Sequence, residues 1–472
     1  MQPMSLSALA RVMDGALTDV TDLEAPVTSV VFDSREAAAG TLFLALCGDH
    51  GDGHEYARPA VEAGAVAVLA TRPVGVPAIV VEDVLEAFGR LARHLVHTTL
   101  NGTTIVAITG SAGKTSTKDL IAQTLAAAGP TVATYQSFNN EIGLPLTITR
   151  ADPATRYLVL EMGARGVGHI ASLTGIAPPA ISVVTNVGTA HIGEFGGRDR
   201  IALAKGEIVE ALPPHGVAVL NADDPLVSAM ARRTTARVVT YGLAADATIR
   251  ATDVRLDAQG RPGYTLTTPE GTAPVRLRLL GEPQVHNSLA AAAVAREAGM
   301  GVEQTAVLLD AATLRSPWRM ETTTRADGVT VINDAYNANP DSMRHSLDAL
   351  AAVARGGDRR AIAVLGRMNE LGDDSPGAHE GIGRTAAGLG LEQLITIGGE
   401  EARWMQRAAS AAGANAVQVP DQDTALELLR RTLRPGDVVL VKASRGVQLQ
   451  QLAEQLLKPA TGTVPVGARQ RP

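Results

Sequence analysis

The sequence TIVAITGSAGKTS, residues 104–116, carries the clearest structural signal in this 472-residue chain. Its first six residues form an apolar run of strand length, and residues 116–128 are typical of a helix. The glycines of Gly110-Ser111-Ala112-Gly113 lie at the junction, where backbone N–H groups can turn toward an anion without Cβ clashes. Lys114 would reach the β- and γ-phosphates of a nucleotide, and the Thr115 hydroxyl would bind Mg²⁺. This stretch therefore predicts a strand, a phosphate-binding loop and a helix.

The loop departs from the strict Walker pattern, because its glycines are closer together and Ile108 stands where the first glycine is expected. Since Gly-Lys-Thr also occurs by chance, an ordinary turn between a strand and a helix is the alternative. The strand before the loop and the helix after it favour phosphate binding.

Downstream of the loop, near-continuous apolar runs end in polar residues or glycine: YLVLEMG, ISVVTNVG, VAVLNADDP and VVTYG. Such runs are typical of parallel strands buried on both faces, with ligands at their carboxyl ends. Residues 245–280 alternate and contain turn pairs, which predicts antiparallel strands at the edge of this sheet. An alanine-rich helix is expected over residues 287–298, with Gly299 as its stop.

The apolar runs group into three α/β domains, which we place at residues 1–100, 101–315 and 316–472. The first domain contains short runs such as TLFLALCG and AVAVLA, with a helical stretch at residues 57–63. The central domain is a phosphate-loop domain with a mostly parallel sheet. The third contains VTVINDAY, AIAVLG, LITIGG and DVVLVKAS, which predict a doubly wound, Rossmann-like sheet.

Composition argues against several classes of function. The formal net charge is −7 and no basic run interleaved with aromatics occurs, so a nucleic-acid partner is not expected. No apolar run approaches the roughly 20 residues that span a bilayer. The amino-terminal stretch lacks the basic region of a signal peptide, and Cys47 is the one cysteine. We expect a cytoplasmic protein without membrane insertion.

Three polar residues downstream of the loop are candidate metal ligands. Glu161 ends the run YLVLE, where a carboxylate can hold Mg²⁺, although a capping or salt-bridging glutamate is the alternative. His191 follows the strand end at Thr185-Asn186, and a lone histidine is more often structural. Lys205 lies on a helix predicted at residues 199–212. Because an ammonium cannot ligate a cation, only a covalent change such as a carbamate formed with CO₂ would make Lys205 a ligand.

Three further candidates lie farther along the chain. Asn287 begins the predicted alanine-rich helix and could be its N-cap or contact a base edge. Asp334 ends the run VTVIND and could be a cap or turn residue, or bind a ribose hydroxyl. Arg319 could reach across as a cation for a transferring phosphoryl group, and a surface ion pair between domains is the alternative.

These residues resemble the Mur ligase family, the ATP-dependent ligases that build the peptide of bacterial cell-wall precursors. The family's own nucleotide loop is shorter than a strict Walker loop. The resemblance covers nearly the whole chain. Beyond the loop, it is carried by four segments: NNEIGLP (139–145), EMG (161–163), TNVG (185–188) with His191, and AKGEI (204–208).

Within the family, DAYNANPDSM (334–343) and VLGRMNELG (364–372) resemble the members that add D-alanyl-D-alanine. A diaminopimelate- or lysine-adding ligase and a folylpolyglutamate-type enzyme are the alternatives, and a non-catalytic nucleotide-binding scaffold is a rival of another class. Three residues depart from the pattern: Arg367 replaces an acidic residue, Asn369 is atypical, and Ala443 replaces a glycine. At the amino terminus, Asp33-Ser34-Arg35 resembles a uridine-nucleotide site, although alone it indicates an Asx turn.

The resemblance implies a reaction in which ATP phosphorylates the carboxylate of UDP-N-acetylmuramoyl-tripeptide, and the amine of D-alanyl-D-alanine then displaces phosphate. It implies a role in peptidoglycan synthesis, and thereby in cell shape and cell division; we also expect a monomer. It also implies two Mg²⁺ ions, one on Thr115 and Glu161, the other on His191 and carbamylated Lys205. The implied catalytic residues are Lys114, His191, Lys205 and Arg319; the implied ATP contacts are Gly110, Ser111, Ala112, Gly113, Lys114, Thr115, Ser116, Asn287, Arg319 and Asp334; the implied substrate contacts are Ser34, Arg35, Asn139, Asn140, Tyr336, Asn337 and Asn339.

Overall fold

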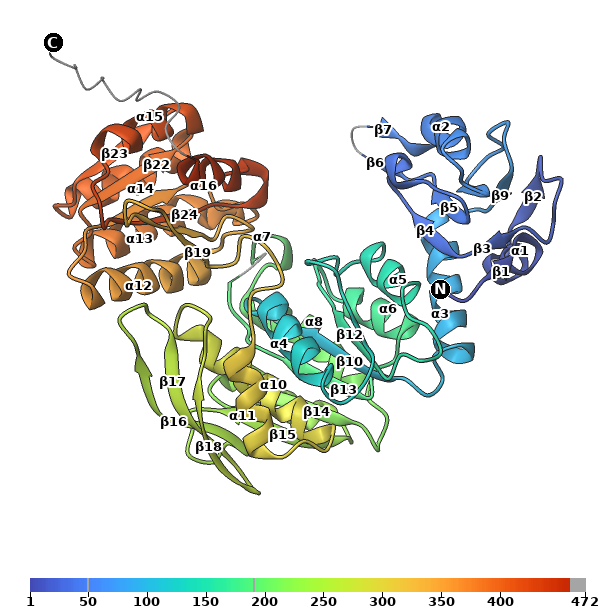
Figure 1. Ribbon diagram of the computed structural model, residues 1–472, viewed down its shortest axis with the longest axis horizontal. Helices are drawn as coiled ribbons and strands as arrows, with labels where there is room; N and C mark the ends of the chain where they lie inside the picture. Colours follow the sequence, from blue (N-terminus) through green and yellow to red (C-terminus); the bar gives the residue numbers. More distant parts are fainter. Residues whose placement is uncertain (49–50, 190–191, 459–472) are drawn as a thin grey trace, which may run out of the picture.

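The computed structural model describes residues 1–48, 51–189 and 192–458. Three large sheets follow one another along the chain, and the predicted boundaries at residues 100 and 315 fall between them. Figure 1 shows the amino-terminal domain in blue and the carboxyl-terminal domain in orange and red, with the central domain joining them. The expected α/β class with parallel-rich sheets is confirmed. No helix among the described residues is long and apolar enough to cross a membrane.

The amino-terminal domain is built on a five-stranded sheet in which only β2 runs antiparallel to its neighbour. Leu9, Phe43 and Phe88 are among its buried side chains. The strand order is β2 (Ala16–Thr18), β9 (Ala78–Val80), β8 (Ala67–Ala70), β5 (Thr41–Leu44) and β4 (Ser29–Val31), and the helices are α1 (Leu6–Met13), α2 (Ala57–Glu62) and α3 (Val84–Thr98). Two short pairs complete it, β1 (Met4–Ser5) with β3 (Pro26–Val27) and β6 (Cys47–Gly48) with β7 (Gly51–Asp52).

The central domain is built on a nine-stranded sheet whose first seven strands are parallel. The expected antiparallel edge is present in β17 and β18, whereas β16 pairs parallel with β15. The order is β11 (Thr131–Ala133), β12 (Tyr157–Glu161), β10 (Thr104–Thr109), β13 (Ile181–Val184), β14 (Val217–Asn221), β15 (Arg237–Gly242), β16 (Ile249–Leu256), β17 (Pro262–Thr268) and β18 (Gly271–Arg276).

Two predicted helices of the central domain begin earlier in the chain than expected. The helix after the phosphate loop, α4, begins at Lys114, so the loop leads directly into its first turn. The alanine-rich helix α10 begins at Pro283, which places Asn287 inside the helix; the N-cap alternative for Asn287 is therefore wrong. The helices are α4 (Lys114–Leu125), α5 (Gly143–Ile148), α6 (His169–Ile176), α7 (Ile192–Phe195), α8 (Arg198–Glu210), α9 (Pro225–Ser228), α10 (Pro283–Glu297) and α11 (Val302–Ala311).

The carboxyl-terminal domain is doubly wound, as predicted, because separate apolar clusters cover the two faces of its six-stranded sheet. The edge strand β19 is antiparallel and the other strands are parallel. The order is β19 (Glu321–Thr324), β20 (Thr330–Asn333), β24 (Val438–Lys442), β21 (Ala361–Leu365), β22 (Gln393–Ile397) and β23 (Ala416–Val419), with helices α12 (Pro340–Gly356), α13 (Ser375–Gly388), α14 (Glu400–Ala411), α15 (Gln422–Thr432) and α16 (Gln450–Leu457).

Candidate active site

A cavity of about 740 Å³ lies between the central and carboxyl-terminal domains. It brings together most of the predicted site residues from both domains, although they are up to 228 positions apart in the sequence. Gly110, Ser34 and Arg35 do not line it, and His191 lies outside the described residues. The predicted residues that line it are Ser111, Ala112, Gly113, Lys114, Thr115, Ser116, Asn139, Asn140, Glu161, Lys205, Asn287, Arg319, Asp334, Tyr336, Asn337 and Asn339.

The phosphate loop is held in place by the carboxyl end of β13. The Thr185 hydroxyl donates to the carbonyl of Ala112 (2.7 Å), while the amide oxygen of Asn186 accepts from the Ala112 N–H (2.9 Å). Gly110 has a φ of 152°, and a Cβ there would lie 1.8 Å from the Thr185 hydroxyl oxygen. The Ala112 N–H is already bound to Asn186 and is therefore not available to an anion. The N–H groups at the start of α4 have no acceptor within the helix, so they are the donors that remain for one.

Lys114 lies folded over this loop. Its ammonium donates to the carbonyl of Gly110 (2.7 Å). Burial lowers the pKa of Lys114, and the nearby Glu161 carboxylate partly offsets this effect. A phosphate group bound in the loop would place a full negative charge beside the buried ammonium.

Glu161 is the clearest candidate metal ligand. It ends β12, and its side chain is buried. Asn139 donates to one carboxylate oxygen (2.7 Å), while the other is buried without a hydrogen-bond partner in the described part of the chain. An unpartnered buried carboxylate oxygen is unfavourable, and a divalent cation would satisfy it. Glu161 therefore fits the predicted Mg²⁺ role, and Asn139 orients it.

The Thr115 hydroxyl links the loop to the other domain. It shares a hydrogen bond of 2.6 Å with the Ser137 hydroxyl and accepts one from the Arg319 guanidinium (3.0 Å). Arg319 also donates to Ser137 (2.8 Å), and its guanidinium carbon lies 4.0 Å from the centre of the Tyr336 ring. Arg319 therefore reaches the phosphate loop from the carboxyl-terminal domain, as predicted.

Lys205 lies on α8 with 4% of its surface exposed. Burial lowers the pKa of Lys205 well below its usual range, and the neighbouring Lys114 ammonium adds to the effect. A neutral amine is the form that reacts with CO₂, so this environment fits the predicted carbamate. The alternative of a solvated helix lysine is wrong.

Asn287 docks α10 against the start of α4. Its amide oxygen accepts from the Thr117 hydroxyl (3.1 Å), and a Cβ on Gly113 would lie 2.6 Å from that oxygen. Its amide nitrogen donates to Gln284 (3.0 Å). Asn287 therefore packs against the phosphate loop at Gly113. Its contact with the nucleotide base stays a prediction.

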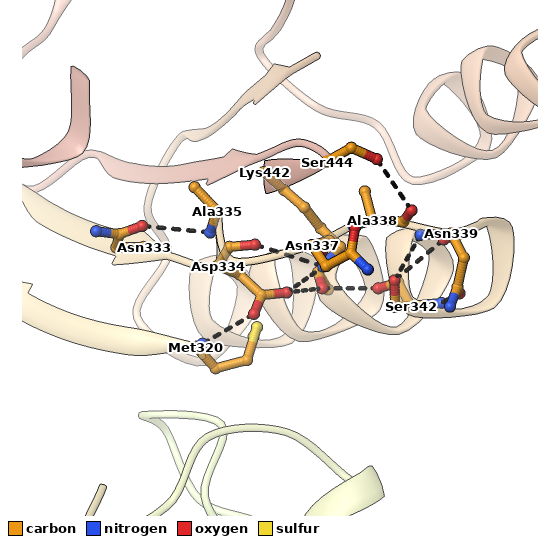
Figure 2. Close-up of polar contacts among 11 residues, drawn as sticks. Met320, Asn333, Asp334, Ala335, Asn337, Ala338, Asn339, Ser342, Lys442 and Ser444 are labelled. Carbon is orange, nitrogen blue, oxygen red and sulfur yellow. Dashed lines mark hydrogen bonds and ion pairs between the residues drawn. The ribbon is translucent and has the colours of Figure 1, made fainter. Parts of the chain in front are cut away.

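Asp334 lies at the end of β20, and its carboxylate is engaged within its own domain (Figure 2). It accepts from the Met320 N–H (3.1 Å), the Ser346 hydroxyl (2.7 Å) and the Lys442 ammonium (2.5 Å). Lys442 also donates to the carbonyl of Asn337 (3.0 Å). A ribose hydroxyl would have to share the Asp334 oxygens, so that contact stays a prediction.

Four predicted substrate contacts have local structural partners. Asn339 caps α12 reciprocally with Ser342, and the Asn337 amide oxygen accepts from the Ala338 N–H (2.9 Å). The Asn140 side chain accepts from the Gly143 N–H at the start of α5 (3.1 Å). In the amino-terminal domain, Asp33 accepts from the Arg35 N–H (3.0 Å), which is the Asx turn that the sequence indicated. These contacts leave the substrate roles untested.

Several residues of the site had no role assigned from the sequence. Ser137 carried no recognisable signal, and the roles of Asn186, Lys442 and Arg445 depend on contacts across the fold. Arg445 lines the cavity, with its guanidinium carbon 4.9 Å from the Tyr336 ring centre and 5.6 Å from that of Trp318.

Comparison with known proteins places this geometry in a family. Family models match residues 26–95 (Mur ligase family, catalytic domain), 108–295 (Mur ligase middle domain) and 318–445 (Mur ligase, glutamate ligase domain). The UDP-N-acetylmuramoyl-tripeptide–D-alanyl-D-alanine ligase of Mycobacterium tuberculosis is 48% identical, covering 97% of this chain and 98% of that protein. The Escherichia coli protein of the same description is 32% identical, covering 97% and 99%.

Solved structures agree over most of the chain. A crystal structure of MurF from Acinetobacter baumannii has a TM-score of 0.86 at 29% identity, covering 97% of this chain and 99% of that one. MurF ligase from Thermotoga maritima, solved in complex with ADP, has a TM-score of 0.78 at 30% identity, covering 91% and 97%. With its three domains, its interdomain phosphate loop and these matches, the chain belongs to the Mur ligase family.

Proposed function

We propose that this protein uses ATP to join D-alanyl-D-alanine to UDP-N-acetylmuramoyl-tripeptide, in peptidoglycan precursor synthesis. The observation that carries the proposal is the interdomain cavity, where the phosphate loop, the unpartnered Glu161 oxygen and the buried Lys205 meet beneath Arg319. Relatives that match this chain from end to end are named for that reaction. The cytoplasmic location and the monomeric state expected from the sequence stay predictions.

The reaction must turn a carboxylate into an electrophile. An oxygen of the tripeptide carboxylate attacks the γ-phosphorus of ATP, and ADP leaves with the bridging electron pair. The dipeptide amine then attacks the acyl carbon, and the C–O bond breaks to release phosphate as the nitrogen loses a proton. Lys114 and Arg319 approach the phosphate loop from two domains and stabilise negative charge on the transferring group.

Mg²⁺ would supply further charge neutralisation on the phosphate oxygens and the incoming carboxylate. We assign Thr115 and Glu161 to one ion, and His191 with carbamylated Lys205 to the other. The Glu161 oxygen and the burial of Lys205 support these assignments. Closure of the cavity by the carboxyl-terminal domain orients the amine and keeps water from the acyl phosphate.

A substrate panel tests the proposal. The purified protein, ATP, Mg²⁺ and UDP-N-acetylmuramoyl-tripeptide are combined with D-alanyl-D-alanine, diaminopimelate, lysine or glutamate, and phosphate release is measured. We expect release only with D-alanyl-D-alanine, and none from Lys114→Ala, which loses the loop cation. Release with another amine would assign the chain to a different ligation, and release without any amine would contradict the ligase function.

A further inference from the structure

Arg445 is a cavity cation that forms no ion pair within 4 Å in the part of the chain that the structure describes. On the carboxyl-terminal wall, the cavity is lined by three lysine or arginine side chains: Arg319, Lys442 and Arg445. Lys442 is paired with Asp334, and Arg319 is bound to two hydroxyl groups at the phosphate loop. The Arg445 guanidinium instead contacts the rings of Tyr336 and Trp318, without a carboxylate partner among the described residues.

The backbone that carries Arg445 is fixed by the residue before it. The Ser444 hydroxyl accepts from the Asn369 N–H (2.8 Å) and donates to the carbonyl of Ala338 (3.3 Å). The Ser444 N–H donates to the carbonyl of Arg367 (3.0 Å). Ser444 therefore joins three separate segments, and Figure 2 shows its contact with Ala338 beside the Lys442–Asp334 pair. The base of the Arg445 side chain has little freedom.

The Arg445 side chain itself is also positioned. Its guanidinium lies against two aromatic rings, and the attraction between a cation and the face of a ring restrains it there. A planar guanidinium presents paired N–H donors that match the two oxygens of a carboxylate. Ring contact leaves the edge of the guanidinium available for such a pair, so Arg445 has the properties of a preorganised carboxylate receptor.

Asn369 adds a second donor beside it. Asn369 also lines the cavity, and its amide nitrogen lies 3.7 Å from the position that a Cβ on Gly446 would take. A neutral amide next to a guanidinium donates to an anion without adding charge.

We propose that Arg445, assisted by Asn369, binds the terminal carboxylate of D-alanyl-D-alanine; this inference rests on the proposed function. The dipeptide is a zwitterion, and its amine must reach the acyl phosphate at the loop while its carboxylate needs a cation farther away. Two extended residues span roughly 7 Å. Arg319 at the loop and Arg445 contact the same Tyr336 ring, with guanidinium carbons 4.0 and 4.9 Å from its centre, so a carboxylate held at Arg445 lies close enough to the loop for the amine to reach it.

A cycle of enzyme and substrate changes tests this pairing. Wild type and Arg445→Gln are assayed with D-alanyl-D-alanine and with its carboxamide, which lacks the negative charge. We expect the carboxamide to raise the wild-type KM by about 10- to 100-fold, as for a hydrogen bond to a charged group. Arg445→Gln is expected to raise the KM for D-alanyl-D-alanine by a similar factor, to add little further loss with the carboxamide, and to leave the KM values for ATP and the tripeptide unchanged.

Two variants complete the design. Arg445→Lys keeps the positive charge but loses the paired N–H donors, so its KM for D-alanyl-D-alanine is expected to lie between those of wild type and Arg445→Gln. This variant still tests the proposal if Arg445→Gln proves unstable. Arg403→Gln removes a charge from an exposed side chain on α14 of the same domain and should leave every constant unchanged.

If the effects of Arg445→Gln and of the carboxamide on KM are independent and multiply, Arg445 does not bind the carboxylate, and the proposed function stands. An increase in the KM for ATP would instead assign Arg445 to the nucleotide. If wild type forms no product with D-alanyl-D-alanine, the proposed function and this inference both fail.

Discussion

Glu161 and Lys205 show how burial changes the chemistry of single residues. Their exposed fractions are 1% and 4%, although both types are usually solvated. The sequence places Glu161 at a strand end, which is enough to suggest a metal role. It places Lys205 on a helix, where the pattern alone predicts a solvated ammonium. Only the family resemblance singled out Lys205, because helix periodicity does not reveal which neighbouring elements cover a side chain.

Lys205→Ala tests the carbamate. We expect kcat to fall by at least about 100-fold, because the variant loses an oxygen donor at the metal. A short carboxylic acid such as acetate should restore part of the activity, since it offers the same kind of oxygen in the vacated space. Arg200→Ala, which removes an exposed cation from the same helix, should be unaffected. Wild-type-like activity in Lys205→Ala would disprove the role.

At the scale of elements, β10, the phosphate loop and α4 were predictable because strand, glycines and helix are adjacent in sequence. The residues that hold the loop in place were not predictable, since Thr185 and Asn186 contact it from 73 or more positions away in the sequence. Those residues were noticed as part of a family segment, yet their contacts with Ala112 depend on the pairing of β10 with β13. Short strands such as β19 and β23 were also missed, because four residues at a sheet edge leave a weak pattern.

Gly110→Ala tests the clamped loop. A methyl group there would overlap the Thr185 hydroxyl and would sit on a backbone with a φ of 152°. We expect the loop to shift and ATP affinity, measured by isothermal titration calorimetry, to fall by more than about tenfold, with a loss of about 1–3 kcal/mol in unfolding free energy. Gly102→Ala, where the added Cβ meets nothing within 4 Å, is the matched control. Unchanged ATP binding in Gly110→Ala would contradict the described loop.

In the whole molecule, the active site exists only where two domains meet. Besides Arg319, the carboxylate of Asp341 at the start of α12 accepts from the backbone N–H (3.0 Å) and the hydroxyl (3.1 Å) of Thr189 in the central domain. Each domain was predictable from its own apolar runs. The contacts between them were not, because no sequence pattern records how separately folded units face each other.

Asp341→Asn tests this interdomain contact. The loss of hydrogen bonds from a partly exposed carboxylate is expected to weaken domain closure by about 1 kcal/mol, or roughly fivefold. We therefore expect a several-fold lower kcat with an unchanged melting temperature, because each domain keeps its own core. Asp348→Asn on the exposed side of the same helix should change neither. Equal effects from both substitutions would rule out a specific role for Asp341.

Trp318 has a consequence for how this enzyme can be observed. The chain has only two tryptophans. Trp404 contacts His379 within the carboxyl-terminal domain, whereas Trp318 lies beneath the Arg445 guanidinium at the cavity. Indole emission is sensitive to a nearby positive charge, so any ligand that draws Arg445 away from its ring will alter one of the two fluorophores. The protein therefore carries an intrinsic fluorophore that reports on ligands that move Arg445, readable without a dye or a coupled reaction.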